Sequence, residues 1–188
     1  MHSPSLKFRR LSLITTISIV CMIILSCENK ISQIPKSDLL TLPSLTGKDI
    51  ETVLTDSGLI QLILTSPLIE QYDKADKPYS EFRFGLKVIA YNGQKDPVAS
   101  VTAKYGKCTD NNLWELRDSV VVINENNEKL ETEVLFWNQQ KDLIYTDRFV
   151  KITSEDEVIQ GIGFESDSHL SKQKIKKVTA DIYLKDEK

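Results

Sequence analysis

The amino-acid sequence predicts an all-β domain built from stacked antiparallel strand pairs, preceded by an N-terminal signal or anchor segment. Three observations predict it. After residue 49, apolar and polar side chains alternate in short runs, turn-forming residues separate these runs, and one pair of runs is repeated along the chain. No run in this region keeps a helical period for three turns. We therefore expect roughly ten to thirteen strands.

Residues 1–26 are expected to form a signal peptide of the lipoprotein type. Three basic residues lie within the first ten, residues 11–26 carry no charge, and Cys27 follows directly. A basic head, a short apolar stretch and a small residue at the cleavage site are typical of a secretory signal. The sequence ILSC at 24–27 resembles a bacterial lipobox, whose cysteine accepts a diacylglycerol group. Cys27 is therefore the predicted lipidation site.

An uncleaved transmembrane anchor is the alternative for the same segment. A membrane-spanning helix needs ~20 apolar residues, and the uncharged stretch is shorter than that. Both arrangements place the rest of the chain outside the cytoplasm and attach it to a membrane.

Residues 27–48 are expected to combine the lipidated Cys27 with a linker. This stretch contains Pro35 and Pro43 and shows little periodicity. The β-domain is then expected to occupy residues 49–188.

Alternation with period two predicts strands that have one buried face and one solvated face. The predicted inward-facing residues of the first two clear runs are Phe82, Phe84, Leu86, Val88 and Ala90, followed by Ala99, Val101, Ala103 and Tyr105. Near the C-terminus the alternating residues are Val178, Ala180, Ile182 and Leu184. Asn92-Gly93 and several Asn-rich or Asp-rich tetrapeptides separate the runs, as hairpin turns require.

The internal repeat relates residues 113–122 to residues 143–152 at an offset of 30. A second strand follows each copy, at 130–135 and at 159–164. Each unit of such a stack buries its apolar face only against its neighbours, so the two ends of the stack are open strand edges that can pair with another protein. The alternation breaks within residues 130–137, which indicates a β-bulge there.

Composition and charge exclude several classes of function. Without the three basic residues of the signal segment the formal net charge changes from −3 to −6, and a mildly acidic domain does not suit nucleic acid. Removal of the signal and lipidation of Cys27 leave Cys108 as the only free cysteine, beside the single histidine His169. The sequence shows no Ser-His-Asp or Cys-His arrangement. We therefore expect no catalytic site, no bound metal and no cofactor.

These features together resemble the LptC family, the periplasmic component of the lipopolysaccharide export machine, which is related to the OstA-like domains. The resemblance covers about residues 49–185. It rests on Asp56-Ser57-Gly58, Pro78-Tyr79-Ser80-Glu81-Phe82, Leu113-Trp114-Glu115, the segments 129–133, 135–137 and 144–152, and Gly161-Ile162-Gly163-Phe164-Glu165-Ser166-Asp167.

The resemblance implies a twisted β-jelly roll that is open along one side and carries lipopolysaccharide. Such a protein would accept lipopolysaccharide from the inner-membrane ABC transporter, through its LptF and LptG subunits, and pass it to an LptA-like periplasmic protein. It would lie on the periplasmic face of the envelope, at the inner membrane, or at the outer membrane if it is a lipoprotein. The partner edge for the LptA-like protein would contain Val178, Ala180, Ile182 and Leu184.

A groove for acyl chains would need apolar residues on the inner faces of the strands. The predicted groove residues are Phe84, Leu86, Val88, Val101, Ala103, Val120, Val122, Val150 and Ile152. The same residue types would also form an ordinary packed core. A structural or adhesion-type β-sandwich lipoprotein with a sealed core is therefore the alternative function.

Overall fold

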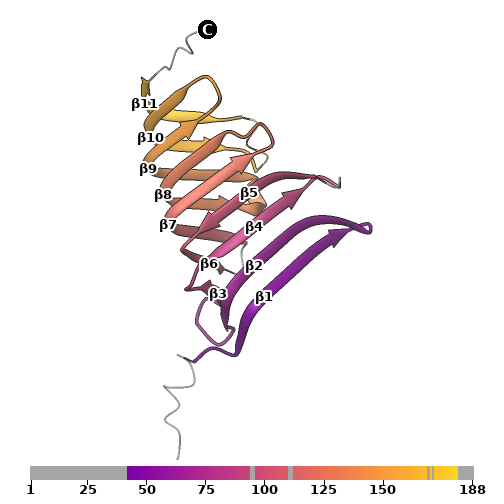
Figure 1. Ribbon diagram of the computed structural model, residues 1–188. Coiled ribbons are helices and arrows are strands. Elements are labelled where there is room, and N and C mark those ends of the chain that lie inside the picture. Colours follow the sequence, from indigo (N-terminus) through magenta and orange to yellow (C-terminus); the bar gives the residue numbers. More distant parts are fainter. Residues whose placement is uncertain (1–41, 94–95, 110–111, 169, 171, 182–188) are drawn as a thin grey trace, which may run out of the picture. The chain divides into compact units, whose positions relative to one another are not determined.

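The computed structural model describes residues 42–93, 96–109, 112–168, 170 and 172–181. Their strands form one antiparallel sheet (Figure 1), which confirms the predicted all-β class and the partly open jelly-roll arrangement. The signal segment and Cys27 lie outside the described residues. The strands are β1 (Leu45–Asp56), β2 (Leu59–Tyr72), β3 (Tyr79–Phe82), β4 (Leu86–Tyr91), β5 (Pro97–Ala103), β6 (Tyr105–Thr109), β7 (Leu113–Asn124), β8 (Lys129–Asn138), β9 (Leu143–Thr153), β10 (Val158–Ser166) and β11 (Lys174–Asp181), with the short 3₁₀ helix η1 (Gln139–Lys141) between β8 and β9.

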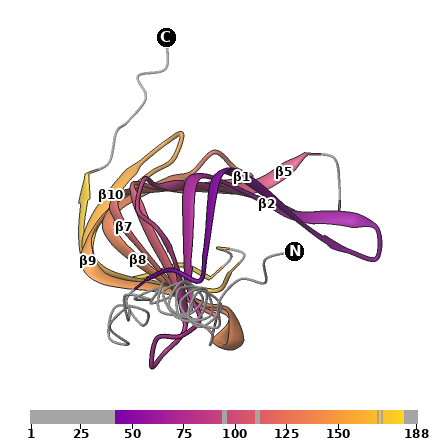
Figure 2. The ribbon, with the colours of Figure 1, turned by 90° about the horizontal axis from the view of Figure 1, so that it is seen from below.

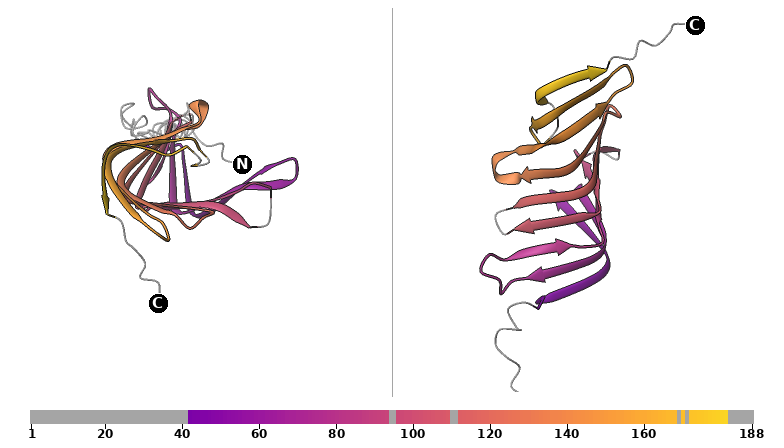
Figure 3. Two further views of the ribbon diagram at one scale, coloured as in Figure 1. Left: turned by 90° about the horizontal axis from the view of Figure 1, so that it is seen from above. Right: turned by 90° about the vertical axis from the view of Figure 1, so that its left-hand side faces the viewer.

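Two walls arise at β2 and β7, because each of these strands pairs with different neighbours along its two halves. In β7, residues 121–124 pair with β5, whereas residues 114–117 pair with β6. In the same way β2 pairs with β4 through residues 62–65 and with β3 through residues 70–72. We call the wall that contains β4 and β5 wall A and the wall that contains β3 and β6 wall B. Figures 2 and 3 show the long strands curving from one wall into the other.

Buried hydroxyl groups lie at the bend between the walls. The Ser66 hydroxyl donates to the carbonyl oxygen of Gly85 at 2.7 Å, and the Thr132 hydroxyl donates to that of Phe149 at 2.8 Å. The Thr146 hydroxyl accepts a hydrogen bond from the backbone N–H of Arg148 at 3.1 Å. Each hydroxyl therefore satisfies a backbone group that the bend removes from the regular ladder.

Residues with positive φ also lie at the bend between the walls. Gly85 has φ +87° and Gly163 has φ +80°, in the region where a side chain would be strained. Asp118 and Ser119, at 63° and 58°, interrupt β7 between its two pairing halves. Polar residues of this kind tolerate the left-handed region better than apolar ones do.

Replacing Thr132 with valine should lower the free energy of unfolding by about 1–2 kcal/mol, because the carbonyl oxygen of Phe149 would lose a buried donor. The measurement is urea denaturation followed by circular dichroism. Thr179→Val, at an exposed position of β11, is the control and should change stability by less than about 0.5 kcal/mol. Equal losses in the two variants would contradict a structural role for the bend hydroxyls.

The internal repeat corresponds to consecutive strand pairs of the stack. The buried residues of β7 and β9 recur at the predicted offset of 30, as Leu116 and Thr146, then Val120 and Val150, then Val122 and Ile152. The predicted bulge is also confirmed, because the pairing of β8 with β9 shifts register between Thr132 and Phe136.

The first strand begins at Leu45, within the stretch expected to be linker. It pairs with β2 over its whole length, from Leu45 opposite Gln71 to Asp56 opposite Leu59. The preceding Ser44 joins the same structure, since its hydroxyl donates to the Asp73 carboxylate at 2.8 Å.

Candidate functional site

Wall A presents a continuous apolar row to the space between the walls. Strand register places one residue from each of seven neighbouring strands opposite the next: Leu64, Val88, Val101, Val122, Leu130, Ile152 and Ile159. Four of the predicted groove residues, Val88, Val101, Val122 and Ile152, belong to this row. Leu86, Ala103, Val120 and Val150 belong to the adjacent row, nearer to the bend.

Phe84 does not belong to the buried cluster that contains the predicted groove residues Leu86 and Ala103. Its side chain is 70% exposed, whereas Phe82 is 2% exposed and belongs to the buried cluster. The strand alternation that placed Phe84 inside is interrupted between β3 and β4, where Gly85 adopts a positive φ. Phe82 and Leu86 therefore both point inward, and Phe84 points away from the cluster.

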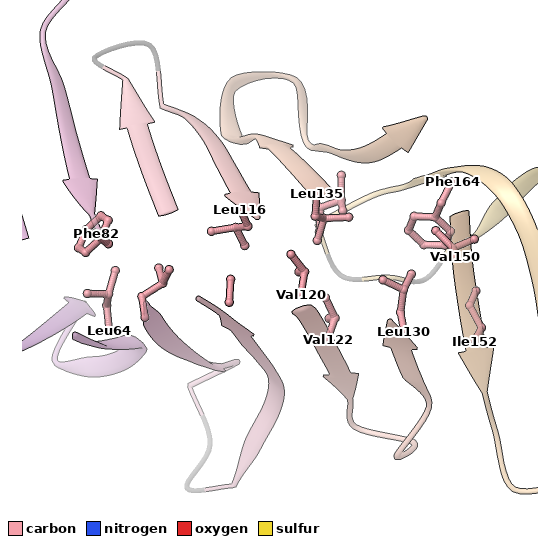
Figure 4. Close-up of a cluster of buried hydrophobic side chains, with 13 residues drawn as sticks. Leu64, Phe82, Leu116, Val120, Val122, Leu130, Leu135, Val150, Ile152 and Phe164 are labelled. Atoms are coloured by element: carbon pink, nitrogen blue, oxygen red, sulfur yellow. The ribbon is translucent and has the colours of Figure 1, made fainter. Parts of the chain in front are cut away.

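Wall B supplies the opposite side of the interior. Figure 4 shows Phe82, Leu116, Leu135 and Phe164 in one row, facing a second row from wall A. Sequence reasoning did not assign these four residues to the site. The internal repeat could have identified two of them, since Leu135 and Phe164 occupy equivalent positions in the strands that follow its two copies.

An aromatic line extends along wall B beside this row. The ring centroid of Trp114 lies 5.7 Å from that of Phe82 and 6.5 Å from that of Trp137. Trp114 and Trp137 face each other across β7 and β8, and both pack against the buried cluster. Their flat rings give the interior an apolar surface on the side opposite the aliphatic row.

Burial changes along the stack. Val120, Val150 and Phe164 are all 0% exposed, so the walls are packed together in the middle of the stack. At the N-terminal end, Leu54 and Ile60 lie on the inner face of the β1–β2 hairpin and are 58% and 41% exposed. The interior therefore opens toward β1. We call the space between the walls the trough.

Two cavities mark the accessible parts of the trough. A cavity of about 940 Å³ lies along the free ends of the strands, between Leu54, Leu62 and Ala99 on wall A and Trp137 on wall B. A second cavity of about 300 Å³ lies at the C-terminal end and is lined by Ile152, Ile159, Ile175 and Val178, with Glu128 and Gln173 among its polar residues.

Described residues of the β10–β11 connection contact both walls beside the larger cavity. The indole N–H of Trp137 donates to the Ser168 hydroxyl at 2.8 Å, and the Gln173 amide donates to the Glu128 carboxylate at 3.2 Å. Leu170 packs against the buried cluster. These contacts narrow the trough toward its C-terminal end.

The C-terminal edge strand β11 pairs with β10 from Lys174 opposite Glu165 to Asp181 opposite Val158. In the described part of the sheet, β11 has no neighbour on its other side. Val178 is 57% exposed, so its side chain is accessible to a protein that pairs with this edge. Of the other predicted partner-edge residues, Ala180 lies opposite Ile159, whereas Ile182 and Leu184 lie outside the described residues.

Charged groups gather on the outer face of wall B and not in the apolar rows. The Arg83 guanidinium lies 2.9 Å from the Glu70 carboxylate and 3.0 Å from that of Glu81. Glu81 also accepts a hydrogen bond from the Tyr105 hydroxyl at 2.8 Å. Burial, together with this bond to Glu81, raises the pKa of Tyr105 well above its ordinary value of 10.0.

The raised pKa of Tyr105 predicts a loss of stability in alkaline solution. Above pH 10 the unfolded chain releases the Tyr105 proton and the folded chain retains it, so the free energy of unfolding should fall as the pH rises. Replacing Tyr105 with phenylalanine should make this fall shallower, as measured by urea denaturation at several pH values. Tyr91→Phe is the matched control. A slope unchanged by Tyr105→Phe would contradict the assignment.

The described residues show neither a metal centre nor a membrane-spanning helix. They contain no group of three His, Cys, Asp or Glu side chains that could hold a metal ion. None of their helical segments is long and apolar enough to cross a membrane.

Cys108 lies in β6, where its thiol contacts the carbonyl oxygen of Thr109 at 3.6 Å. His169 lies outside the described residues.

The sequence matches the model of a known protein family. A family model described as "LptC: Lipopolysaccharide-assembly, LptC-related" matches residues 12–183, which is most of the chain and includes nearly all of the β-domain. Among curated proteins, none matches the chain.

Proposed function

Because the chain belongs to the LptC-related family of lipopolysaccharide-assembly proteins, we propose that it carries lipopolysaccharide by holding the acyl chains in the trough. Family membership implies a role in lipopolysaccharide transport, and proteins of this family are periplasmic and attached to the inner membrane. We further propose that the LptF and LptG subunits of the export transporter deliver the lipid and that an LptA-like protein receives it.

The continuous apolar row of wall A is the observation that supports this proposal most directly. An acyl chain of a dozen carbons in water would expose apolar surface that costs on the order of 10 kcal/mol, at ~0.8 kcal/mol per methylene. The row crosses seven strands without a charged side chain, from Leu64 to Ile159. It follows the stacking direction of the strands, which is the direction in which lipid would have to move.

The open N-terminal end supports the proposed direction of entry. Leu54 and Ile60 expose inward-facing apolar surface there, and β1 is an edge strand of the sheet that the described residues form. Strand addition by the transporter at this edge would cover that surface and continue the trough. The exposed Val178 on β11 supports the corresponding exit edge at the other end.

Site-specific photo-crosslinking tests the trough. A photoreactive amino acid at Val88 or Val101, which are partly buried on the inner face, should capture lipopolysaccharide in cells. The same residue at Lys87 or Thr102 points to the outer face of the same strands and should capture little or none. Lipid adducts at the outer positions alone would refute the assignment.

Co-purification distinguishes a lipid conduit, in which acyl chains occupy the trough, from a structural β-sandwich protein with a sealed core. The conduit should co-purify with lipopolysaccharide and transporter subunits, whereas the structural protein should co-purify with neither. The fully buried Val120, Val150 and Phe164 are the residues that favour a sealed core. The two cavities and the exposed Leu54 and Ile60 favour the conduit.

A further inference from the structure

Two exposed apolar side chains lie next to each other on the outer side of the bend. Phe149 of β9 is 54% exposed and Ile162 of β10 is 50% exposed, and strand register places them opposite each other. Phe149 belongs to the bend, since its carbonyl oxygen accepts the hydrogen bond from Thr132. The strands curve here from one wall into the other (Figure 2), so the outer side is convex and accessible to a flat surface.

Basic residues adjoin this apolar pair on two strands. Arg148 precedes Phe149 in β9, and Lys151 follows it two positions later. Lys177 of β11 lies opposite Ile162 in the strand register. The apolar pair therefore has a cation on each side along the stack.

A further lysine of β11 lies on the same side of the sheet. The side chain of Lys176 packs beside Gly163, whose φ of +80° marks the bend of β10. Lys176 and Arg148 line one cavity on the outer face of wall B, together with Tyr145. We call the apolar pair and its four cations the basic ridge, which consists of Arg148, Phe149, Lys151, Ile162, Lys176 and Lys177.

The strands of the basic ridge carry an excess of positive charge. β9, β10 and β11 contain five basic and three acidic residues. Two of the acids pair with ridge residues, Asp147 with Arg148 at 3.4 Å and Glu165 with Lys176 at 2.6 Å. The partners of the longer pair are 81% and 63% exposed, and surface pairs of this kind hold their members weakly. On the β8 side the ridge ends at the bulge that contains Glu133.

Phe84 shows that exposure alone does not define such a surface. It is 70% exposed and also points away from the buried cluster. The cavity beside it is lined by two acids, Asp49 and Glu51, and by two bases, Lys87 and Lys104. The charges around Phe84 therefore balance, whereas those of the basic ridge do not. The two phenylalanines form a matched pair for experiments.

We propose that the basic ridge docks on an anionic lipid bilayer. Exposed apolar side chains enter the boundary between headgroups and acyl chains, and neighbouring lysine and arginine side chains meet the lipid phosphates. Proteins of the LptC-related family are attached to the inner membrane, so a bilayer lies close to the domain. The ridge adds a second membrane contact to that attachment, and this inference does not rest on the proposed lipid transport.

The predicted linker is long enough to permit this contact. In the sheet order, seven strand spacings separate β1 from β10, which corresponds to about 34 Å at ~4.8 Å per spacing. With the predicted anchor at Cys27, residues 28–44 reach up to about 56 Å when extended. The ridge can therefore meet the same bilayer that holds the N-terminal anchor.

Photo-crosslinking to phospholipid tests the docking. The full-length protein, with a photoreactive amino acid at position 149, is reconstituted into vesicles of equimolar phosphatidylcholine and phosphatidylglycerol, and lipid adducts are measured by mass spectrometry. Position 149 should capture roughly fivefold more phospholipid than position 84, the matched exposed phenylalanine. In vesicles of phosphatidylcholine alone, capture at position 149 should fall to the level of position 84.

Neutral substitutions test the role of charge. Lys151→Gln combined with Lys177→Gln should lower capture at position 149 roughly tenfold or more, because each base near an anionic surface contributes roughly a fivefold factor. The control variant combines Lys87→Gln with Lys104→Gln, which removes the two lysines beside Phe84 and should leave capture at position 149 unchanged. Circular dichroism checks that both variants keep the fold.

Several results would overturn the inference. Equal capture at positions 84 and 149 would show that the anchored domain meets lipid without a preferred face. Capture at position 149 that does not depend on phosphatidylglycerol or on the two lysines would remove the electrostatic basis. Absence of lipid adducts at position 149, or adducts with protein only, would show that the ridge does not dock on the bilayer. Crosslinking at Val88 and Val101 tests the trough separately.

Discussion

Replacing Phe164 with alanine should lower the free energy of unfolding by about 3–5 kcal/mol. Phe164 is 0% exposed and is among the largest fully buried side chains. It faces Val150 of wall A in the packed middle of the stack (Figure 4), so its loss would leave a cavity between the two walls. Urea denaturation followed by circular dichroism measures the change.

The matched control for this variant is Phe84→Ala. Phe84 is the same residue type but is 70% exposed, and its replacement should change stability by less than about 1 kcal/mol. Similar losses in the two variants would show that Phe84 packs in the interior, as the sequence alternation had suggested, and would contradict the arrangement of the bend at Gly85.

Replacing Gly161 with alanine should displace the edge strand β11. A Cβ atom at this position would clash with Cγ2 of Ile175 and would lie 2.5 Å from the carbonyl oxygen of Lys177. Because the second of these atoms belongs to the backbone, β11 must move to relieve the contact. We expect a loss of about 1–3 kcal/mol and faster amide hydrogen exchange in residues 174–181.

Gly58→Ala provides the comparison for the glycine variant. Gly58 lies in the β1–β2 turn, where an added Cβ would meet nothing within 4 Å, although its φ of +81° would strain the backbone. This change should leave hydrogen exchange in β11 unaffected. If Gly161→Ala also leaves it unaffected, the close packing of β10 against β11 is not what holds the C-terminal edge in place.

The sequence predicted the strands of the stack well because alternation and the repeat are local signals. The offset of 30 placed Val120 and Val122 in the same positions as Val150 and Ile152, and the structure places each pair on the inner face of wall A. Eight of the nine predicted groove residues lie in two adjacent inner rows for this reason.

The bend limited what could be predicted. Each strand that crosses it continues in the second wall, and in several strands the inward-facing parity changes at the crossing. In β8 the inward residues are Leu130 and Thr132 before the bend and Leu135 after it, and in β10 Gly161 is followed by Phe164. The local pattern shows that alternation breaks but does not show which face continues the core. Leu135 and Phe164 of wall B were therefore missed, and Phe84 was placed inside.

The bend itself has a mechanical consequence. The ladder hydrogen bonds lie within each wall, so spreading the walls apart would pull on side-chain packing such as Phe164 against Val150 and would leave the ladders intact. We therefore expect the two walls to part to different widths about the bend that contains the hydroxyls of Ser66, Thr132 and Thr146. The volume available to a cargo would then depend on how far the walls part.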